Sequence, residues 1–284
     1  MSHILAEDYV FETLEEDIVW YRQSVHESLA GVERQGHDLN WLATKAYTLA
    51  ALLVLAGRAS DSECGDMMWL AGNAEAYALY LALFPKGAKE LEVLIPKPPG
   101  DVMSIGRTTT GPTSSSSPGH WFKAFYLTLL WEEPFLKEEV LMRSFASTFA
   151  ASSTKAPAYR TLQVEAAQAM YTRSPDAMTK ILAAFDAMQA PGLDPEDQAY
   201  SVEVAQCEAG MMARLVSGDE AGFNDEVRLA LERHIKHYRQ DEAFRNKPVA
   251  WVCLPALGLS ALAQRRGLKV SVQSPLLPLE LISN

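Results

Sequence analysis

His234 and His237 are the pair of side chains best suited to binding a metal ion. Imidazoles three residues apart lie on neighbouring sides of a helix, and Glu232 or Asp241 could supply a carboxylate as a further ligand. His234, however, falls on the apolar stripe of its helix, and the residues around His237 would repel a cation (Arg233, Lys236 and Arg239). We therefore expect a packed His234, a solvated His237, and neither a metal site nor a cofactor.

Other side chains capable of catalysis are scattered along the chain. His26 with Glu27, and His37 with Asp38, are sequence neighbours that point in different directions, so residues from elsewhere would have to complete any catalytic pair. Cys64 lies near a helix start, which lowers a thiol pKa, but three surrounding carboxylates act in the opposite direction (Asp61, Glu63 and Asp66). The sequence has no GxxxxGKS/T, GxSxG or HExxH motif, and no GxGxxG after a strand. We expect that the protein is not an enzyme.

The chain is acidic, and its acidic residues are concentrated in two blocks. It has 36 Asp and Glu against 25 Lys and Arg, a formal net charge of −11. This charge repels phosphate backbones and anionic lipids, so we expect neither a nucleic-acid nor a membrane partner, whereas a basic protein would be attracted. Residues 1–30 hold seven acids and one base, and residues 192–227 hold nine acids and one base. These blocks supply most of the expected partner contacts, with Arg107 as a second choice: Glu12, Glu15, Glu16, Asp194, Glu196, Asp197 and Glu220.

Cysteine usage and hydropathy indicate the compartment. Three widely spaced cysteines without a CxxC pair fit a reducing environment better than a disulfide framework. The N-terminus is acidic within eight residues and does not resemble a signal peptide. The most apolar stretch, from Ala46 to Ala56, is about half the length needed to span a bilayer. We expect a cytoplasmic protein.

Helical spacing of apolar residues dominates the chain and predicts an all-α fold in a single domain, residues 1–284. Antiparallel helix pairs would pack as one bundle or as a short helical-repeat-like array. Residues 96–119, rich in Pro, Gly, Ser and Thr, predict a long loop or linker, and only Leu91–Ile95 and Leu268–Val272 resemble strands. The expected helices lie near residues 11–29, 41–56, 61–84, 121–131, 133–150 (broken by Pro134), 158–171, from 174, from 194, 219–238 and 248–266. Most of the six tryptophans should pack in the core, with one or two at an interface.

The C-terminal part of the chain carries a recognisable order of motifs. These are Ser217-Gly218-Asp219, Phe223, His234, Tyr238, Lys247-Pro248-Val249-Ala250-Trp251, Leu254-Pro255-Ala256-Leu257-Gly258-Leu259, Arg266-Gly267-Leu268 and Ser274-Pro275-Leu276-Leu277-Pro278. This order resembles the immunity protein 49 family, which comprises helical immunity proteins encoded beside the toxins of bacterial polymorphic-toxin systems. The resemblance covers residues 215–282 and implies a cognate toxin as partner. Immunity proteins neutralise a toxin by occluding or distorting its active site.

Three functional hypotheses follow, in order of preference. The first is an immunity protein that binds a cognate, basic toxin in the cytoplasm and occludes its active site. The second is a helical-repeat-like scaffold or regulator that binds another protein or peptide, and the identity of the neighbouring gene would separate it from the first. The third is an enzyme whose site is assembled from dispersed His, Glu and Asp residues. The oligomeric state is left open.

Overall fold

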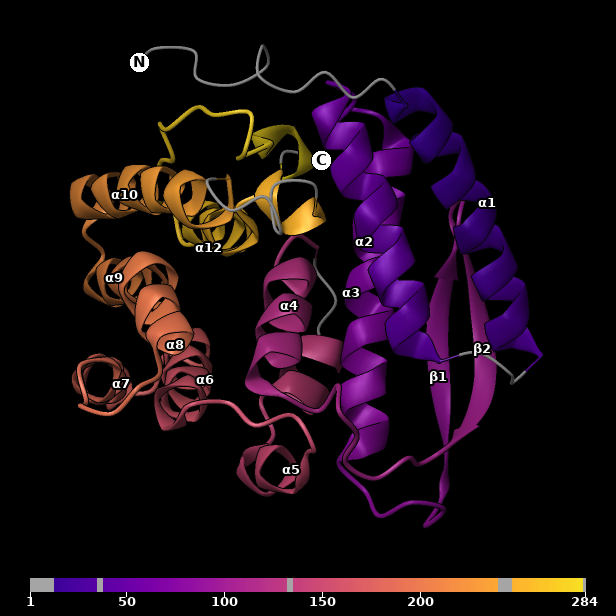
Figure 1. Ribbon diagram of the computed structural model, residues 1–284, viewed down its shortest axis with the longest axis horizontal. Coiled ribbons are helices and arrows are strands. Elements are labelled where there is room, and N and C mark those ends of the chain that lie inside the picture. The colour runs from indigo at the N-terminus through magenta and orange to yellow at the C-terminus, as the bar shows by residue number, and fades with distance from the viewer. Residues whose placement is uncertain (1–12, 35–37, 132–134, 240–246, 283–284) are drawn as a thin grey trace.

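The computed structural model describes residues 13–34, 38–131, 135–239 and 247–282, which are mostly helical (Figure 1). The first three helices are α1 (Leu14–Glu33), α2 (Leu39–Leu55) and α3 (Ser62–Ala82), and each packs against the next. Helix α2 begins where Asp38 accepts a hydrogen bond from the backbone N–H of Asn40 at 2.8 Å. Asp38 therefore has the structural role of a helix cap, as its position before the Trp41 helix suggested.

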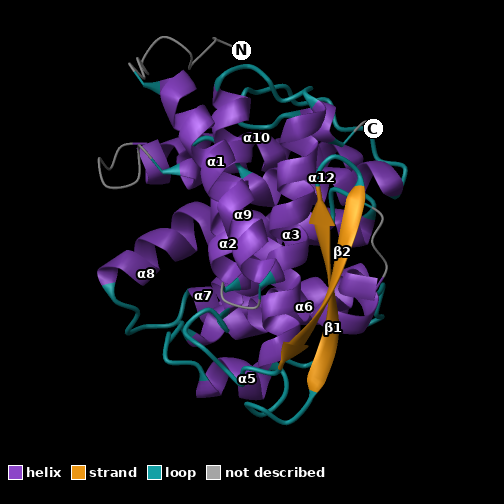
Figure 2. Ribbon diagram, turned by 90° about the vertical axis from the view of Figure 1, so that its right-hand side faces the viewer, coloured by secondary structure: helices purple, strands orange, loops and turns teal. Residues whose placement is uncertain are grey.

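A β-hairpin follows α3. It confirms the expected strand at Leu91–Ile95 and corrects the prediction that residues 96–119 form a loop or linker, because only residues 109–117 lie outside the hairpin and the next helix. Strand β1 (Glu90–Lys97) pairs antiparallel with β2 (Asp101–Thr108), and Pro98, Pro99 and Gly100 form the turn between them. Gly100 has a φ of +78°, which glycine adopts without steric cost. Figure 2 shows the hairpin lying against the outside of the helices. Pro98, Pro99 and Gly100, which resembled part of a linker, thus form a tight turn between two strands.

The second segment expected to resemble a strand, Leu268–Val272, is not one. Its backbone is held by a side chain: Asn224 Nδ2 donates to the Lys269 carbonyl at 2.8 Å, and the Ser271 N–H donates to Asn224 Oδ1 at 2.8 Å. These bonds fix an extended tail along the adjacent helix without a partner strand. The class is therefore broadly all-α with one small sheet.

The rest of the chain forms a second group of helices. Its elements are α4 (Pro118–Thr128), the π-helix η1 (Phe135–Leu141), α5 (Ala146–Ala151), α6 (Ala158–Tyr171), α7 (Ala177–Met188), α8 (Pro195–Tyr200), the π-helix η2 (Ser201–Ala205), α9 (Gln206–Ser217), α10 (Glu220–Arg239), the 3₁₀-helix η3 (Pro248–Ala250), α12 (Leu254–Arg265) and the 3₁₀-helix η4 (Leu279–Leu281). In Figure 1, α4 stands between α1–α3 on the right and α6–α12 on the left. This arrangement does not establish a single bundle or a repeat, and the single domain remains a prediction.

Most helix boundaries agree with the sequence signals, with three exceptions. The helix predicted over residues 133–150 is divided into η1 (Phe135–Leu141) and the separate α5 (Ala146–Ala151). The Asp194 carboxylate accepts from the Asp197 N–H at 2.8 Å at the start of α8, and Gly218 ends α9 with a φ of +69°, both as expected. Ser174 does not cap α7, because its hydroxyl donates to the Asp176 side chain instead. The final helix begins at Leu254 rather than Pro248, because residues 248–250 form the separate helix η3.

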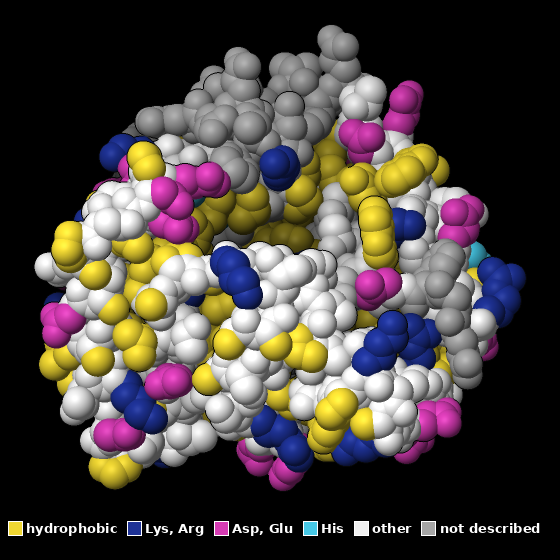
Figure 3. All heavy atoms as spheres, turned by 60° about the horizontal axis from the view of Figure 1, so that its bottom comes forward, with side chains coloured by type: hydrophobic (Ala, Val, Ile, Leu, Met, Phe, Trp, Pro, Cys, Tyr) yellow, Lys and Arg dark blue, Asp and Glu magenta, His cyan; other side chains and the backbone are white. Residues whose placement is uncertain are grey.

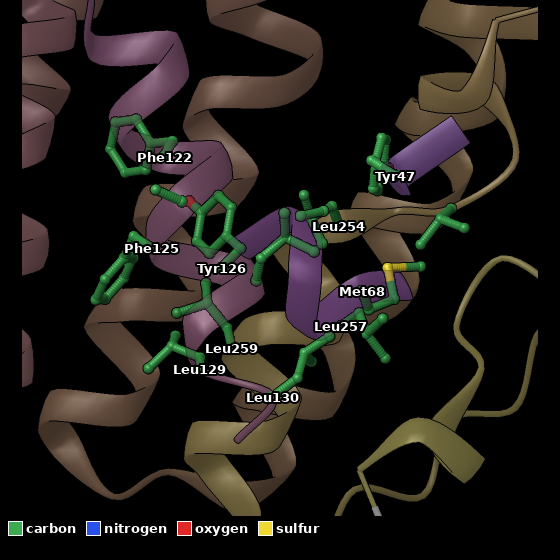
Figure 4. Close-up of a cluster of buried hydrophobic side chains, with 14 of the residues drawn as sticks. Tyr47, Met68, Phe122, Phe125, Tyr126, Leu129, Leu130, Leu254, Leu257 and Leu259 are labelled. Atoms are coloured by element: carbon green, nitrogen blue, oxygen red, sulfur yellow. The ribbon is translucent and has the colours of Figure 1, made fainter. Parts of the chain in front are cut away.

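Helix α4 provides the centre of the hydrophobic core. Trp121 and Phe125 are fully buried and stack with their ring centroids 4.8 Å apart, and Trp121 Nε1 donates to the Leu141 carbonyl at 3.1 Å. Figure 4 shows side chains of α4 in one cluster with Tyr47, Met68 and leucines of α12. The backbones approach so closely that a Cβ atom on Gly258 would lie 2.8 Å from Cα of Tyr126. Only glycine leaves room for α12 against α4 at this point.

We expect Gly258→Ala to destabilise the protein by about 1–3 kcal/mol, because the added methyl group would push α12 away from α4. Gly65→Ala is the matched control, since nothing lies within 4 Å of a Cβ atom at Gly65 inside α3. That substitution should stabilise the protein by up to about 1 kcal/mol, because alanine favours a helix. Urea unfolding measures both changes, and equal effects of the two substitutions would contradict the close approach.

Candidate functional site

Helix α1 exposes two large apolar side chains beside acidic ones. Val19 and Trp20 are each 60% exposed, and Glu15 and Glu16 lie one turn before them on the same outward face. The opposite stripe of α1 is buried in the core (Ile18, Val25 and Val32), which forces these four side chains outward. We call Glu15, Glu16, Val19 and Trp20 the α1 patch. An exposed tryptophan of this kind is typical of protein–protein contact surfaces.

The negative charge of the α1 patch is little offset by its own helix. Arg22, the single base between Leu14 and Glu33, binds Glu63 of α3 through two hydrogen bonds, with Nε–Oε1 at 2.6 Å and Nη2–Oε2 at 2.8 Å. The hydrogen bond from Arg22 is the main reason why the pKa of Glu63 lies below its usual value, against the effect of burial. Arg22 therefore ties α1 to α3. Glu15 Oε2 lies 4.0 Å from Arg58 Nη1, a long ion pair at an exposed position, and Glu16 is exposed on the same face.

The six tryptophans divide into core and surface positions. Trp121 and Trp251 are buried and Trp69 and Trp131 are half-buried, whereas Trp41, at the start of α2, is 66% exposed. Together with Trp20 it is one of two exposed tryptophans. The helical spacing placed these residues on helices, but it did not identify which of them would face solvent.

The acids of the second block lie on or beside α8 to α10. Glu196 of α8 is exposed, Asp197 is half-buried, and burial raises the pKa of Asp197, with the neighbouring Asp194 adding to the effect. Glu220 of α10 is exposed but accepts a hydrogen bond from the Lys269 N–H at 2.8 Å. Both helices belong to the left-hand group in Figure 1, whereas α1 belongs to the right-hand group. Among the described residues, the acids of α1 and those of α8 and α10 therefore lie on different groups of helices.

Arg107 and Glu12 are the two remaining residues expected at the interface. Arg107 lies in β2 rather than in a loop, opposite Leu91, and it is half-buried. Burial is the main cause that lowers its pKa from the usual arginine value. Glu12 lies outside the residues that the structure describes.

A cavity of about 400 Å³ lies between the two groups of helices, and we call it the central cleft. Thr44 and Tyr47 of α2 line one side, and Ala230 and His234 of α10 line another. Its walls are mainly apolar and aromatic, and Figure 3 shows a hollow with hydrophobic side chains between two lobes of the surface. Volume and lining are typical of small-molecule sites in proteins. No local sequence pattern predicts this cavity, because its lining residues come from helices far apart in the chain.

A buried polar network borders the central cleft. Arg160 of α6 and Glu208 of α9 form an ion pair at 2.9 Å, and Gln163 Nε2 donates to the same Glu208 oxygen at 2.7 Å. Burial raises the pKa of Glu208 against the opposing effect of Arg160. The Arg160 guanidinium also lies 4.5 Å from the ring centroid of Phe122 and 5.0 Å from that of Tyr200. These residues are far apart in the chain, so no local motif could reveal the network.

The two histidines considered as metal ligands have separate roles. His234 is 3% exposed, and burial lowers its pKa to about 4, so its imidazole is neutral at physiological pH. His237 is half-buried rather than fully solvated, and its Nδ1 lies 2.9 Å from Glu203 Oε2. Asp241 lies outside the described residues. Within the described part of the chain, no three His, Cys, Asp or Glu side chains come together as a possible metal site.

The three cysteines are buried thiols. Burial is the main cause that raises the pKa of Cys64 to about 12, of Cys207 to about 11 and of Cys253 to about 12. A thiol with such a pKa is protonated at neutral pH, and the thiolate is the form that attacks substrates or binds metals. Cys64 also lies 3.5 Å from the Ala50 carbonyl that accepts its hydrogen bond. The cysteines therefore serve the core rather than nucleophilic chemistry.

His234 should make the stability of the protein depend on pH. In the unfolded chain the imidazole of His234 binds a proton near pH 6.5, whereas in the folded protein it binds a proton only near pH 4, because its pKa is lowered to about 4. Acidification from pH 7 to pH 5 should therefore reduce the free energy of unfolding by about 2 kcal/mol through this residue. The His234→Gln variant should lack this part of the pH dependence. Urea unfolding at several pH values measures it, and identical slopes for both proteins would contradict the buried neutral imidazole.

Comparisons with known proteins identify the family. No curated protein and no solved structure matches the chain. Among the described helices, none has the length and apolar composition that crossing a membrane requires. Residues 58–281 match immunity protein 49, a segment that includes every described helix from α3 to η4 and leaves α1 and α2 outside. Because this match covers most of the sequence, the chain belongs to the immunity protein 49 family.

Proposed function

We propose that this protein is an immunity protein that binds a cognate bacterial toxin in the cytoplasm and neutralises it by covering the toxin's active site. The family supports the general role, and the observation that carries the proposal for this chain is the α1 patch, with a 60% exposed Trp20 beside Glu15 and Glu16. Because α1 lies outside the residues matched to the family, the patch is independent evidence of a contact surface.

The chemistry of the α1 patch indicates a basic partner. Its carboxylates and the overall charge of −11 would attract a cationic protein over a long range and raise the association rate. Once the proteins meet, burial of Trp20 and Val19 would supply affinity, since tryptophan is among the residues that contribute most to interfaces. A positively charged toxin, such as a nuclease, fits both requirements.

The second acidic block is a secondary candidate for contact. Glu196 and Asp194 are exposed at the start of α8, and Glu220 is exposed at the start of α10. Asp194 and Glu220 also make hydrogen bonds within the fold, so Glu196 is the most available of the three. Glu12 and Arg107 are retained as further contacts in the proposal.

The test of this function is co-expression with the polypeptide encoded immediately beside this protein. We expect a stable complex that can be purified through a tag on either chain, and restored growth of cells that produce the toxin. Absence of both a complex and growth rescue would reject the immunity role and favour the alternative of a helical scaffold for another protein.

Charge reversal in the α1 patch should slow association with the toxin. For Glu15→Lys combined with Glu16→Lys we expect an association rate about tenfold lower at low salt, and a smaller difference at high salt. Glu232→Lys, at an exposed position of α10 outside both acidic blocks, is the control and should change the rate little. Surface plasmon resonance measures these rates, and an unchanged association rate at low salt would exclude the patch.

Removal of the exposed tryptophan should instead speed dissociation. Trp20→Ala should weaken binding by at least about 2 kcal/mol, which is roughly a thirtyfold increase in Kd. Leu182→Ala is the matched control, because Leu182 is 56% exposed on α7, far along the chain from the patch. If both variants bind as the parent does, Trp20 is not in the interface.

A further inference from the structure

The central cleft is separate from the α1 patch, since no residue of α1 lines it. It opens to solvent where the exposed Thr44 and Lys247 and the half-buried Lys123 lie on its wall. Deeper in, it is bordered by Phe122 and Tyr126, whose rings stack with centroids 5.5 Å apart. The cleft therefore combines an open mouth with an aromatic and apolar interior, as small-molecule sites commonly do.

Four charged residues of the cleft wall, apart from the exposed Lys247 at its mouth, have partners of opposite charge: Lys123, Arg160, Glu203 and Glu208. Arg160 pairs with Glu208 at 2.9 Å, and Lys123 Nζ lies 3.2 Å from the fully buried Glu75. Glu203 Oε1 lies 2.7 Å from Lys236 Nζ, and its other oxygen contacts His237. An anion or cation entering the cleft would lose its hydration without gaining an unpaired counter-charge.

The aromatic walls also disfavour a cationic ligand. The rings of Phe122 and Tyr200 that could bind a cation through their faces are already covered by the Arg160 guanidinium. Burial raises the pKa values of Tyr47, Tyr126 and Tyr238, so these phenols stay neutral at physiological pH. The imidazole of His234 is neutral as well. These three phenols and the His234 imidazole therefore acquire no charge between pH 6 and pH 8.

We propose that the central cleft binds a neutral aromatic small molecule, held by apolar contact with Phe122, Tyr126 and the walls of α2 and α10. The Tyr126 hydroxyl, which has no hydrogen-bond partner among the described residues, offers one polar contact to such a molecule after a small side-chain movement. The volume of about 400 Å³ accommodates two or three fused or linked rings. This site is independent of toxin binding, so either function can fail without the other.

The experiment uses two fluorescent probes that share a ring system and differ in charge. N-phenylnaphthylamine is neutral, and anilinonaphthalene sulfonate carries the same rings with an added sulfonate. The full-length protein should bind the neutral probe at one saturable site, with increased fluorescence. It should bind the sulfonate at least about tenfold more weakly, because the anion loses hydration without compensation. Equal affinity for both probes, or no saturable binding of the neutral one, would overturn the proposal.

Two substitutions on opposite walls locate the site. Ala230→Leu fills space inside the cleft, and Thr44→Trp narrows its mouth from an exposed position that leaves the core intact. Each should weaken binding of N-phenylnaphthylamine by about tenfold or more. Ala221→Leu, the same substitution at an exposed site of α10 outside the cleft, should leave binding unchanged. If Ala230→Leu does not fold, Thr44→Trp still decides the question, and parental affinity in that variant would overturn the assignment.

Discussion

The burial of α4 on several sides is the constraint on which the arrangement of the other helices depends. Its neighbours are α3 on one flank, α12 on another and α6 on a third, and all of them contact it directly. Trp121 and Phe125 are fully buried there, and the close contacts at Gly258 and Gly72 fix how near α12 and α3 can approach. Because α4 is shared, a shift of this helix would disturb both groups of helices together.

Burying α4 also places charges in the core, and each of them needs a partner. Glu75 of α3 is 0% exposed and contacts both His120 and Lys123 of α4. Burial alone would raise the pKa of Glu75, but Lys123 and His120 lower it, and the net shift is downward. On the opposite flank, Arg160 covers the ring of Phe122 and pairs with Glu208. These contacts connect α4 to both groups and leave the cleft between them without unpaired charge.

Local signals in the sequence predicted most of the helices, whereas features that arise from tertiary contacts were missed. Ala158–Tyr171 was predicted with its observed bounds, and the Asp194 cap was correct, because apolar spacing and capping act within a few residues. The first strand of the hairpin was expected at Leu91–Ile95, but its turn and second strand were missed, because Pro98, Pro99 and Gly100 have the composition of a linker as well as that of a turn. The central cleft and the exposure of Trp20 depend on which helices pack together, and apolar spacing along one helix does not reveal that. The acidic contact residues were chosen from charge alone and remain proposals.

The two proposed sites are subject to different physical constraints. In the α1 patch, Glu15, Glu16, Val19 and Trp20 face solvent, and the stability of α1 depends on the opposite stripe that begins at Ile18. Substitutions in the patch therefore cost little stability, so the residues of the patch can change to suit the surface of a protein partner. The walls of the central cleft are part of the core, where Phe122 and Tyr126 also support the packing of α4. A change of ligand there requires repacking of the core, whereas a change of protein partner requires only a new surface on a helix that the core already holds in place.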